Sequence, residues 1–200
     1  MIESRQTSRK IAGALLFAGA TQFILGMTVA EAAYPGYSVS ENFISDLGIG
    51  PTAALFNSSV FLYGVMVVAS AYFIWRVFSH PGIALLLGLA GAGTIGVGVF
   101  PENFGIVHTL VALIAFLFGG LSPIATCRLE KAPLSYLSIA MGVISLAALV
   151  LLGAGLSLSP GRFFGLGQGG LERMIAYPIL LWAIGFSGYL MSSSQITREN

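Results

Sequence analysis

Six long apolar stretches without a charged side chain constrain the fold of this chain more than any other feature of its sequence. They cover residues 11–30, 53–75, 82–100, 104–126, 132–156 and 174–191, and none contains Asp, Glu, Lys or Arg. A bilayer core is about 30 Å thick, and a helix of about 20 apolar residues crosses it. The sequence therefore predicts an all-α membrane protein, a single domain over residues 1–200 that forms a six-transmembrane helix bundle.

The composition supports the same class and excludes an ordinary soluble domain. Charged residues make up 8% of the chain, whereas soluble domains carry about 25%. The net charge of +1 and the lack of a basic run give no support for a nucleic-acid partner, so membrane lipids are the predicted partners. Cys127 is the only cysteine, which excludes an intramolecular disulfide and a thiolate metal cluster. The residues do not identify a cofactor.

The basic residues predict the direction in which the helices cross the membrane, because short cytoplasmic loops are enriched in Lys and Arg. With the N-terminus inside, seven of the nine basic residues lie on the inner side and only Arg162 and Arg173 lie outside. We therefore expect a protein of the cell membrane with both termini in the cytoplasm. The seven inner residues are Arg5, Arg9, Lys10, Arg76, Arg128, Lys131 and Arg198.

The first apolar stretch has a second interpretation. Basic residues, an apolar run and the sequence "AEA" at 30–32 resemble a signal peptide with its cleavage site. Cleavage would leave five spans and an N-terminus outside. The run is longer than the usual apolar region of about 7–15 residues in a signal peptide, which favours a transmembrane helix.

Small residues are concentrated in the third stretch. Gly88, Ala92 and Gly96 recur at intervals of four, and small residues let helices approach closely in lipid, where packing drives association. We expect the helix over 82–100 to be central in a tightly packed bundle.

The predicted outer loop 31–52 carries the signals of a short helix. Ser38 and Glu41 have the spacing of a capping box, and Gly48 suits a helix end. An apolar face is formed by Val39, Phe43, Ile44 and Leu47, and a polar face by Asn42, Ser45 and Asp46. The pattern predicts a short amphipathic helix that lies on the outer membrane surface or folds down over the bundle.

The stretch "FPENFGIVH" at 100–108 places two ionisable residues between the third and fourth apolar stretches. Glu102 falls in the turn, where a helix N-terminus stabilises a carboxylate. His108 falls about one turn inside the fourth helix, and an ionisable residue there faces the bundle interior or a wet cavity. One interpretation is a neutral histidine hydrogen-bonded to a neighbouring helix, with Asn57 as its candidate neighbour. The other is a functional residue.

The start of the sixth stretch carries an unusual cation. The helix dipole explains Glu172 but disfavours Arg173, which also violates the positive-inside bias. We expect Arg173 to have an anionic partner, with Glu102, Asp46 or a lipid phosphate as the candidates. Tyr177 lies four residues further on the same helical face and is expected to line the same pocket.

These residues converge on one side of the membrane and predict a polar pocket in the outer third of the bundle. One hypothesis is a hydrolase or transferase that acts on a lipid, with His108 as general base and a carboxylate orienting it. The alternatives are a non-catalytic lipid-binding or sensory module, a small-molecule transporter and a structural subunit. In the predicted site, the catalytic residues are His108, Glu102 and Asp46, and the residues that bind an outer-leaflet lipid or small molecule are Arg173, Glu172, Asn57 and Tyr177.

The inner half of the bundle offers few polar groups by comparison. Gln22, Thr94 and Ser145 are too few for a continuous ion path, which needs polar groups at several depths. His80 falls on the inner side and cannot reach His108, so a zinc site would need His108 with Asp46 and Glu102, and no residue is assigned to a metal.

The motifs "SENFISDLG", "GVFPENFGIVH" and "GLERMIAYP" resemble, in this order, a prokaryotic integral-membrane family of unknown function, numbered 998. The likeness extends over residues 40–185. It implies a six-span membrane protein and no particular activity. The residues that would carry the family pattern are Asp46, Asn57, Glu102, His108, Glu172 and Arg173.

Overall fold

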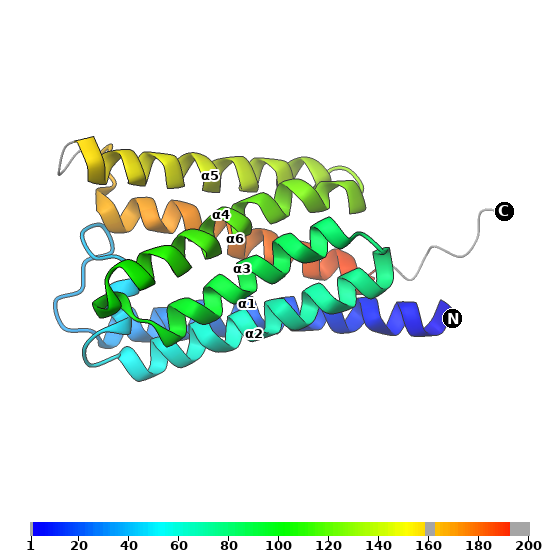
Figure 1. The fold of residues 1–200 in the computed structure, drawn as a ribbon, viewed down its shortest axis with the longest axis horizontal. Coiled ribbons are helices and arrows are strands. Elements are labelled where there is room, and N and C mark those ends of the chain that lie inside the picture. Colours follow the sequence, from blue (N-terminus) through cyan, green and yellow to red (C-terminus); the bar gives the residue numbers. More distant parts are fainter. Residues whose placement is uncertain (1, 159–162, 193–200) are drawn as a thin grey trace.

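The computed structural model describes residues 2–158 and 163–192, which form six long helices and three short 3-10 turns (Figure 1). All six helices are long and apolar enough to cross a membrane, as the sequence predicts. The long helices are α1 (Ile2–Ala33), α2 (Ala53–Phe78), α3 (Pro81–Val99), α4 (Ile106–Thr126), α5 (Leu134–Leu158) and α6 (Gly167–Ser192), and the turns are η1 (Ser45–Gly48), η2 (Glu102–Phe104) and η3 (Cys127–Leu129).

Consecutive helices run antiparallel, so the bundle has two different ends. We call the end that holds residues 34–52 and 100–105 the loop end. The other is the N-terminal end, which holds the start of α1 and the connections 79–80 and 127–133. The short connections at the N-terminal end leave little chain there, whereas the segment 34–52 folds over the loop end.

The helices form a closed arrangement in which each contacts the next and α6 returns to α1. Helix α5 lies at the outside of the bundle, against α4 and α6 (Figure 1). The predicted close packing of α3 is confirmed, because a Cβ added at Gly93 would lie 2.5 Å from the backbone N of Ala115 on α4. On the other side of α3, a Cβ at Gly91 would lie 2.9 Å from the carbonyl O of Gly64 on α2. The predicted central position of α3 is wrong, because α3 packs mainly against its two neighbours α2 and α4.

Helix α6 begins at Gly167, seven residues before the predicted start of its span. The sequence places Glu172 and Arg173 at the mouth of this helix, but they lie in its second turn. The glycines at 167, 169 and 170 disfavour a helix on propensity alone. Here the first turn of α6 packs against the loop between α1 and α2, and the amide of Gly169 donates to the carbonyl of Ser40 at 2.8 Å.

The predicted amphipathic helix between Ser38 and Gly48 is much shorter than expected. Only η1 is helical, and the preceding residues form turns. The amide of Glu41 bonds the Ser38 hydroxyl at 3.4 Å, as in a capping box, yet no α-helix follows. Ile44 and Leu47 are buried in the bundle core. The segment therefore folds down over the bundle, the second of the two predicted placements, and backbone contacts to α6 replace helical hydrogen bonds.

Candidate functional site

An elongated cavity runs along the inside of the bundle from the loop end. Five helices and η1 contribute its lining, and α5 contributes no lining residue. On α4 the lining extends from His108 to Ser122, a rise of about 21 Å at 1.5 Å per residue. The cavity volume open to the centres of water-sized molecules is about 90 Å³. We call this long cavity of small volume the slot.

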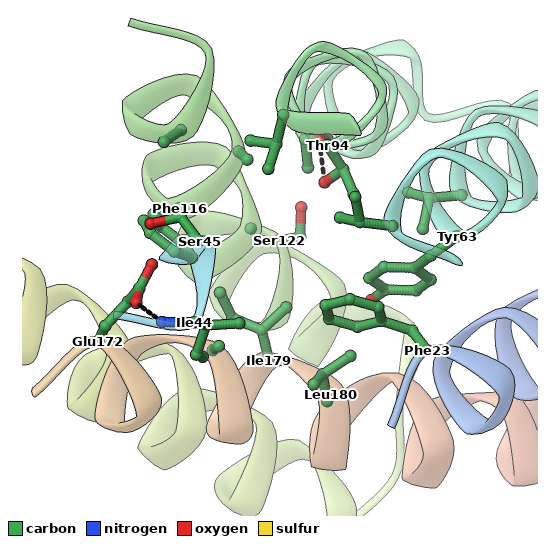
Figure 2. A pocket seen from close by; sticks show the side chains of 18 of the residues that line it. Phe23, Ile44, Ser45, Tyr63, Thr94, Phe116, Ser122, Glu172, Ile179 and Leu180 are labelled. Atoms are coloured by element: carbon green, nitrogen blue, oxygen red, sulfur yellow. Dashed lines mark hydrogen bonds between the residues drawn. The ribbon is translucent and has the colours of Figure 1, made fainter. Parts of the chain in front are cut away.

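The walls of the slot are mainly apolar. Phe23 of α1 stacks on Tyr63 of α2 with ring centroids 5.6 Å apart, and Ile179 and Leu180 of α6 lie opposite (Figure 2). Two hydroxyl residues line the wall, but each donates to a carbonyl of its own helix. Thr94 bonds Ala90 O at 2.8 Å and Ser122 bonds Phe118 O at 2.7 Å. Trp182 lines the slot ten residues, or about 15 Å, along α6 from Glu172.

The loop end of the slot is polar. Ser45 and Glu172 lie there (Figure 2), and His108 also belongs to the lining. Glu172 is buried, and its Oε2 accepts the backbone N–H of Ile44. Its other oxygen, Oε1, accepts no hydrogen bond from the described residues. One carboxylate oxygen therefore holds the loop, and the other is available to the slot.

His108 is 7% exposed and its Nδ1 lies 2.8 Å from the carbonyl O of Phe100. A carbonyl can only accept, so Nδ1 carries the proton and Nε2 of the neutral ring is an acceptor. This contact satisfies a carbonyl at the end of α3. The predicted buried, hydrogen-bonded histidine is confirmed, but its expected neighbour Asn57 is wrong. The partner comes from the same α3–α4 connection.

Asp46 and Glu102 bring two carboxyl groups together where η1 meets η2. Asp46 accepts from the side-chain amide of Asn42 at 2.8 Å and from the N–H of Phe43 at 3.0 Å. Glu102 accepts a long hydrogen bond, 3.5 Å, from the Ser45 hydroxyl. Burial, and then the hydrogen bond and charge of Asp46, raise the pKa of Glu102 to about 7. The predicted proximity of these two carboxyls is present, but neither is among the residues that line the slot.

Arg173 makes five hydrogen bonds, four of which tie α6 to α1 and to the loop. Its Nη1 donates to the carbonyls of Val39, Asn42 and Gly169 at 2.9, 3.2 and 3.0 Å. Its Nη2 donates to Glu31 Oε1 at 2.5 Å and to the Tyr37 hydroxyl at 2.6 Å. Arg173 thus has the anionic partner that was expected, but the candidates Glu102, Asp46 and a lipid phosphate are wrong, because Glu31 at the end of α1 fills that role.

We call Glu31, Tyr37, Glu172 and Arg173 the loop latch. In segment 39–44, Glu172 accepts a hydrogen bond from the backbone amide of Ile44, and Arg173 donates to the backbone carbonyls of Val39 and Asn42. Burial raises the pKa of Tyr37 to about 12, even though the nearby guanidinium opposes that shift. Tyr37 is therefore a neutral hydrogen-bonding group that accepts from Arg173 and donates to Phe43 O at 2.9 Å.

Gly169 permits the close approach on which the latch depends. A Cβ at this position would lie 1.9 Å from the carbonyl O of Asn42, far inside contact distance. Gly169 stands directly before the motif "GLERMIAYP" and lets the loop approach α6, and Glu172 and Arg173 within the motif then hold the loop. The motif is thus partly a structural signal.

Two other predicted site residues lie away from the slot. Asn57 donates from Nδ2 to Gly48 O at 3.0 Å and ties η1 to α2. Tyr177 is 39% exposed and does not line the cavity, so its predicted place in the pocket is wrong. The physical reason is that Tyr177 shares a face with Arg173, whereas the slot is lined by the face that carries Glu172, Ala176 and Ile179.

Sequence reasoning missed a second polar cluster, at the N-terminal end. Glu130 directly follows η3 and is only 9% exposed. Its Oε2 accepts from Ser138 at 2.6 Å, while Oε1 and the nearby indole Nε1 of Trp182 have no hydrogen-bond partner. Burial raises the pKa of Glu130, although the hydrogen bond from Ser138 opposes that shift. The sequence signal that could have indicated this cluster is that Glu130 follows Thr126, the last residue of α4, by four positions.

The described residues contain no group of three or more His, Cys, Asp and Glu side chains that could hold a metal ion. The polar end of the slot can act through hydrogen bonds and charge. It offers the imidazole of His108, a carboxyl oxygen of Glu172 and the hydroxyl of Ser45.

Comparison with known proteins identifies a family and no relative. No curated protein and no solved structure matches the chain. A family model, described as protein of unknown function (DUF998), matches residues 17–188. This match covers most of the chain and confirms the resemblance seen in its motifs. The chain is thus a multi-pass membrane protein that belongs to the DUF998 family.

Proposed function

We propose that this protein is a binding module for a single-chain amphiphile of the membrane. The observation that carries the proposal is the slot: long, narrow and apolar along the bundle, with its carboxylate and imidazole at one end only. Apolar cavities of this kind stay dry and take up apolar ligands. A chain in the slot would bring its polar head to Ser45, His108 and Glu172, and the narrow cross-section favours one chain over the two of a phospholipid.

Trp182 offers a direct test, because it lines the slot far from the polar end. The other tryptophan, Trp75, is exposed on the surface and is removed by Trp75→Phe. A long-chain alcohol brominated at its terminal carbon is then added to the full chain in nanodiscs. We expect saturable quenching of Trp182 fluorescence.

Matched variants separate the slot from the surrounding lipid. Ala112→Leu narrows the slot and should abolish the saturable quenching, whereas Ala147→Leu on the exposed face of α5 should leave it unchanged. Thermal unfolding of both variants verifies that they are folded. Quenching that rises linearly with added probe, or is equal in both variants, would contradict the proposal.

A second candidate is the lipid hydrolase or transferase that uses His108 as general base. One observation favours it: Nδ1 is held by a backbone carbonyl, which leaves Nε2 as an acceptor in the slot lining, as a base requires. This candidate predicts that His108→Ala abolishes turnover of a long-chain ester while the protein stays folded. Binding with no turnover by the unsubstituted chain would exclude it.

A further inference from the structure

We infer that the head of the bound amphiphile is a hydrogen-bond donor, a hydroxyl or a protonated amine, and is not an anion. This inference rests on the proposed function, since it concerns the head of the ligand that the slot would take. Three features of the loop end carry it: the acceptors that line the slot, the engagement of the nearby cation, and the charge of the surrounding groups.

The polar end of the slot offers acceptors. When the His108 ring is neutral, its Nε2 is an acceptor, because Nδ1 carries the ring proton and donates to Phe100 O. Oε1 of Glu172 is an acceptor that the loop does not use. Ser45 directs its hydroxyl proton toward Glu102 Oε2, so its oxygen also presents lone pairs. A ligand head satisfies these groups only if it brings protons to them.

The cation at this end is engaged elsewhere. Arg173 is the one basic residue among the described residues of the loop end, and its two terminal nitrogens make five hydrogen bonds within the latch. It does not line the slot. A phosphate or carboxylate head could reach the guanidinium only by displacing Glu31 or the carbonyls that Arg173 holds, and that exchange breaks the latch.

The ionisable groups near the polar end, other than His108, are acidic. Glu172 lines the slot, and Glu102 and Asp46 lie close enough to Glu172 to act on it through their charges. An anionic head would enter among three carboxyl groups, and each of them that is ionised would repel it in a poorly screened site. A protonated amine would instead gain a charge-assisted hydrogen bond to Glu172.

The test is a series of competitors that share one chain and differ in the head. Each displaces the brominated alcohol from Trp182 in the Trp75→Phe protein at neutral pH. The competitors are hexadecanol, hexadecylamine, hexadecyl phosphate and hexadecyltrimethylammonium. We expect the alcohol and the amine to compete, and the phosphate to be weaker by about tenfold or more. The quaternary ammonium carries charge without an N–H, so it should also compete weakly.

Glu172→Gln sharpens the test, because its amide oxygen can still accept from Ile44 while the negative charge is gone. In this variant the amine should lose its advantage over the alcohol, and the phosphate should recover part of its affinity. A phosphate that competes as well as the alcohol in the unsubstituted protein would overturn this inference and leave the proposed function standing. If no probe quenches Trp182 saturably, the proposed function fails and the inference fails with it.

Discussion

Each end of the bundle buries an arginine and a glutamate, but in very different surroundings. At the loop end, Arg173 makes five hydrogen bonds and leaves only Nε without a partner. At the N-terminal end, Arg9 is 7% exposed, and its Nε and Nη2 make no hydrogen bond. Its guanidinium lies instead over the rings of Phe78 and Tyr189, at 5.6 and 5.2 Å from their centroids.

The two glutamates repeat the contrast. Glu172 accepts the amide of Ile44 and so replaces a hydrogen bond that the irregular loop lacks. Glu130 accepts only from the hydroxyl of Ser138 and keeps one oxygen unpartnered. The difference teaches that burial alone does not show what a charged residue contributes. The loop-end pair holds the backbone of another segment, whereas the pair at the N-terminal end holds none.

The largest expected effect comes from breaking the latch at Arg173. Arg173→Ala leaves Glu31 without its cation and three carbonyls without their donor, so the free energy of unfolding should fall by about 3–5 kcal/mol. Arg9→Met preserves the length of the side chain and loses a cation–π interaction of about 0.5–2 kcal/mol. Unfolding by SDS titration in mixed micelles measures both. Equal losses at the two ends would contradict the comparison.

Gly169→Ala tests the same latch without touching a charge. The added methyl meets Asn42 O, so the loop must move away from α6, with an expected loss of about 1–3 kcal/mol. Gly88→Ala is the matched control, because a Cβ there meets nothing within 4 Å. That substitution should be neutral or stabilise the helix by up to about 1 kcal/mol. A neutral Gly169→Ala would show that the close approach is not needed.

Much of the fold follows from the sequence, because six uncharged apolar stretches have few ways to fold in lipid. The residue at which α6 begins does not follow from the sequence. The glycine-rich residues 167–170 have the pattern of a flexible loop, and they form the first turn of α6 where they pack against segment 38–42. The pairing of Arg173 with Glu31 also lies beyond local patterns. The two residues are 142 positions apart, and both sit at helix ends that the fold brings together.

The candidate site was predicted in part. His108 and Glu172 line the slot. An ionisable residue within an apolar helix finds polar partners only in the interior of the bundle. Arg173 and Tyr177 carry the same sequence signal but lie on another face of α6. Glu130 was missed because neighbouring Arg128 and Lys131 indicate a solvated loop. Its burial comes from the packing of η3 and α5, which no local pattern reveals.

Substitution of each glutamate by methionine compares the two carboxyls directly. Glu172→Met leaves the amide of Ile44 without an acceptor and should cost about 1–3 kcal/mol. Glu130→Met removes a buried carboxyl whose Oε1 is unpartnered, and Ser138 can then bond within its own helix. We expect this change to be neutral or stabilising at neutral pH, as measured by thermal unfolding. A loss at Glu130 as large as that at Glu172 would indicate a structural role for the unpartnered oxygen.

The smallest effect is expected at the half-buried carboxyl pair. The pKa of Glu102 is raised from 4.5 to about 7, so the folded protein holds this proton more tightly than the unfolded chain does. The stability that Glu102 contributes is therefore complete below about pH 4.5, decreases as the pH rises, and is lost above about pH 7. Glu102→Gln should remove this part of the pH dependence, and Glu41→Gln on the exposed part of the same loop should not. Unfolding midpoints recorded between pH 4 and pH 8, each taken as a difference from the unsubstituted protein, isolate the contribution. A difference, variant minus unsubstituted protein, that stays flat or falls as the pH rises would mean that folding does not raise the pKa of Glu102.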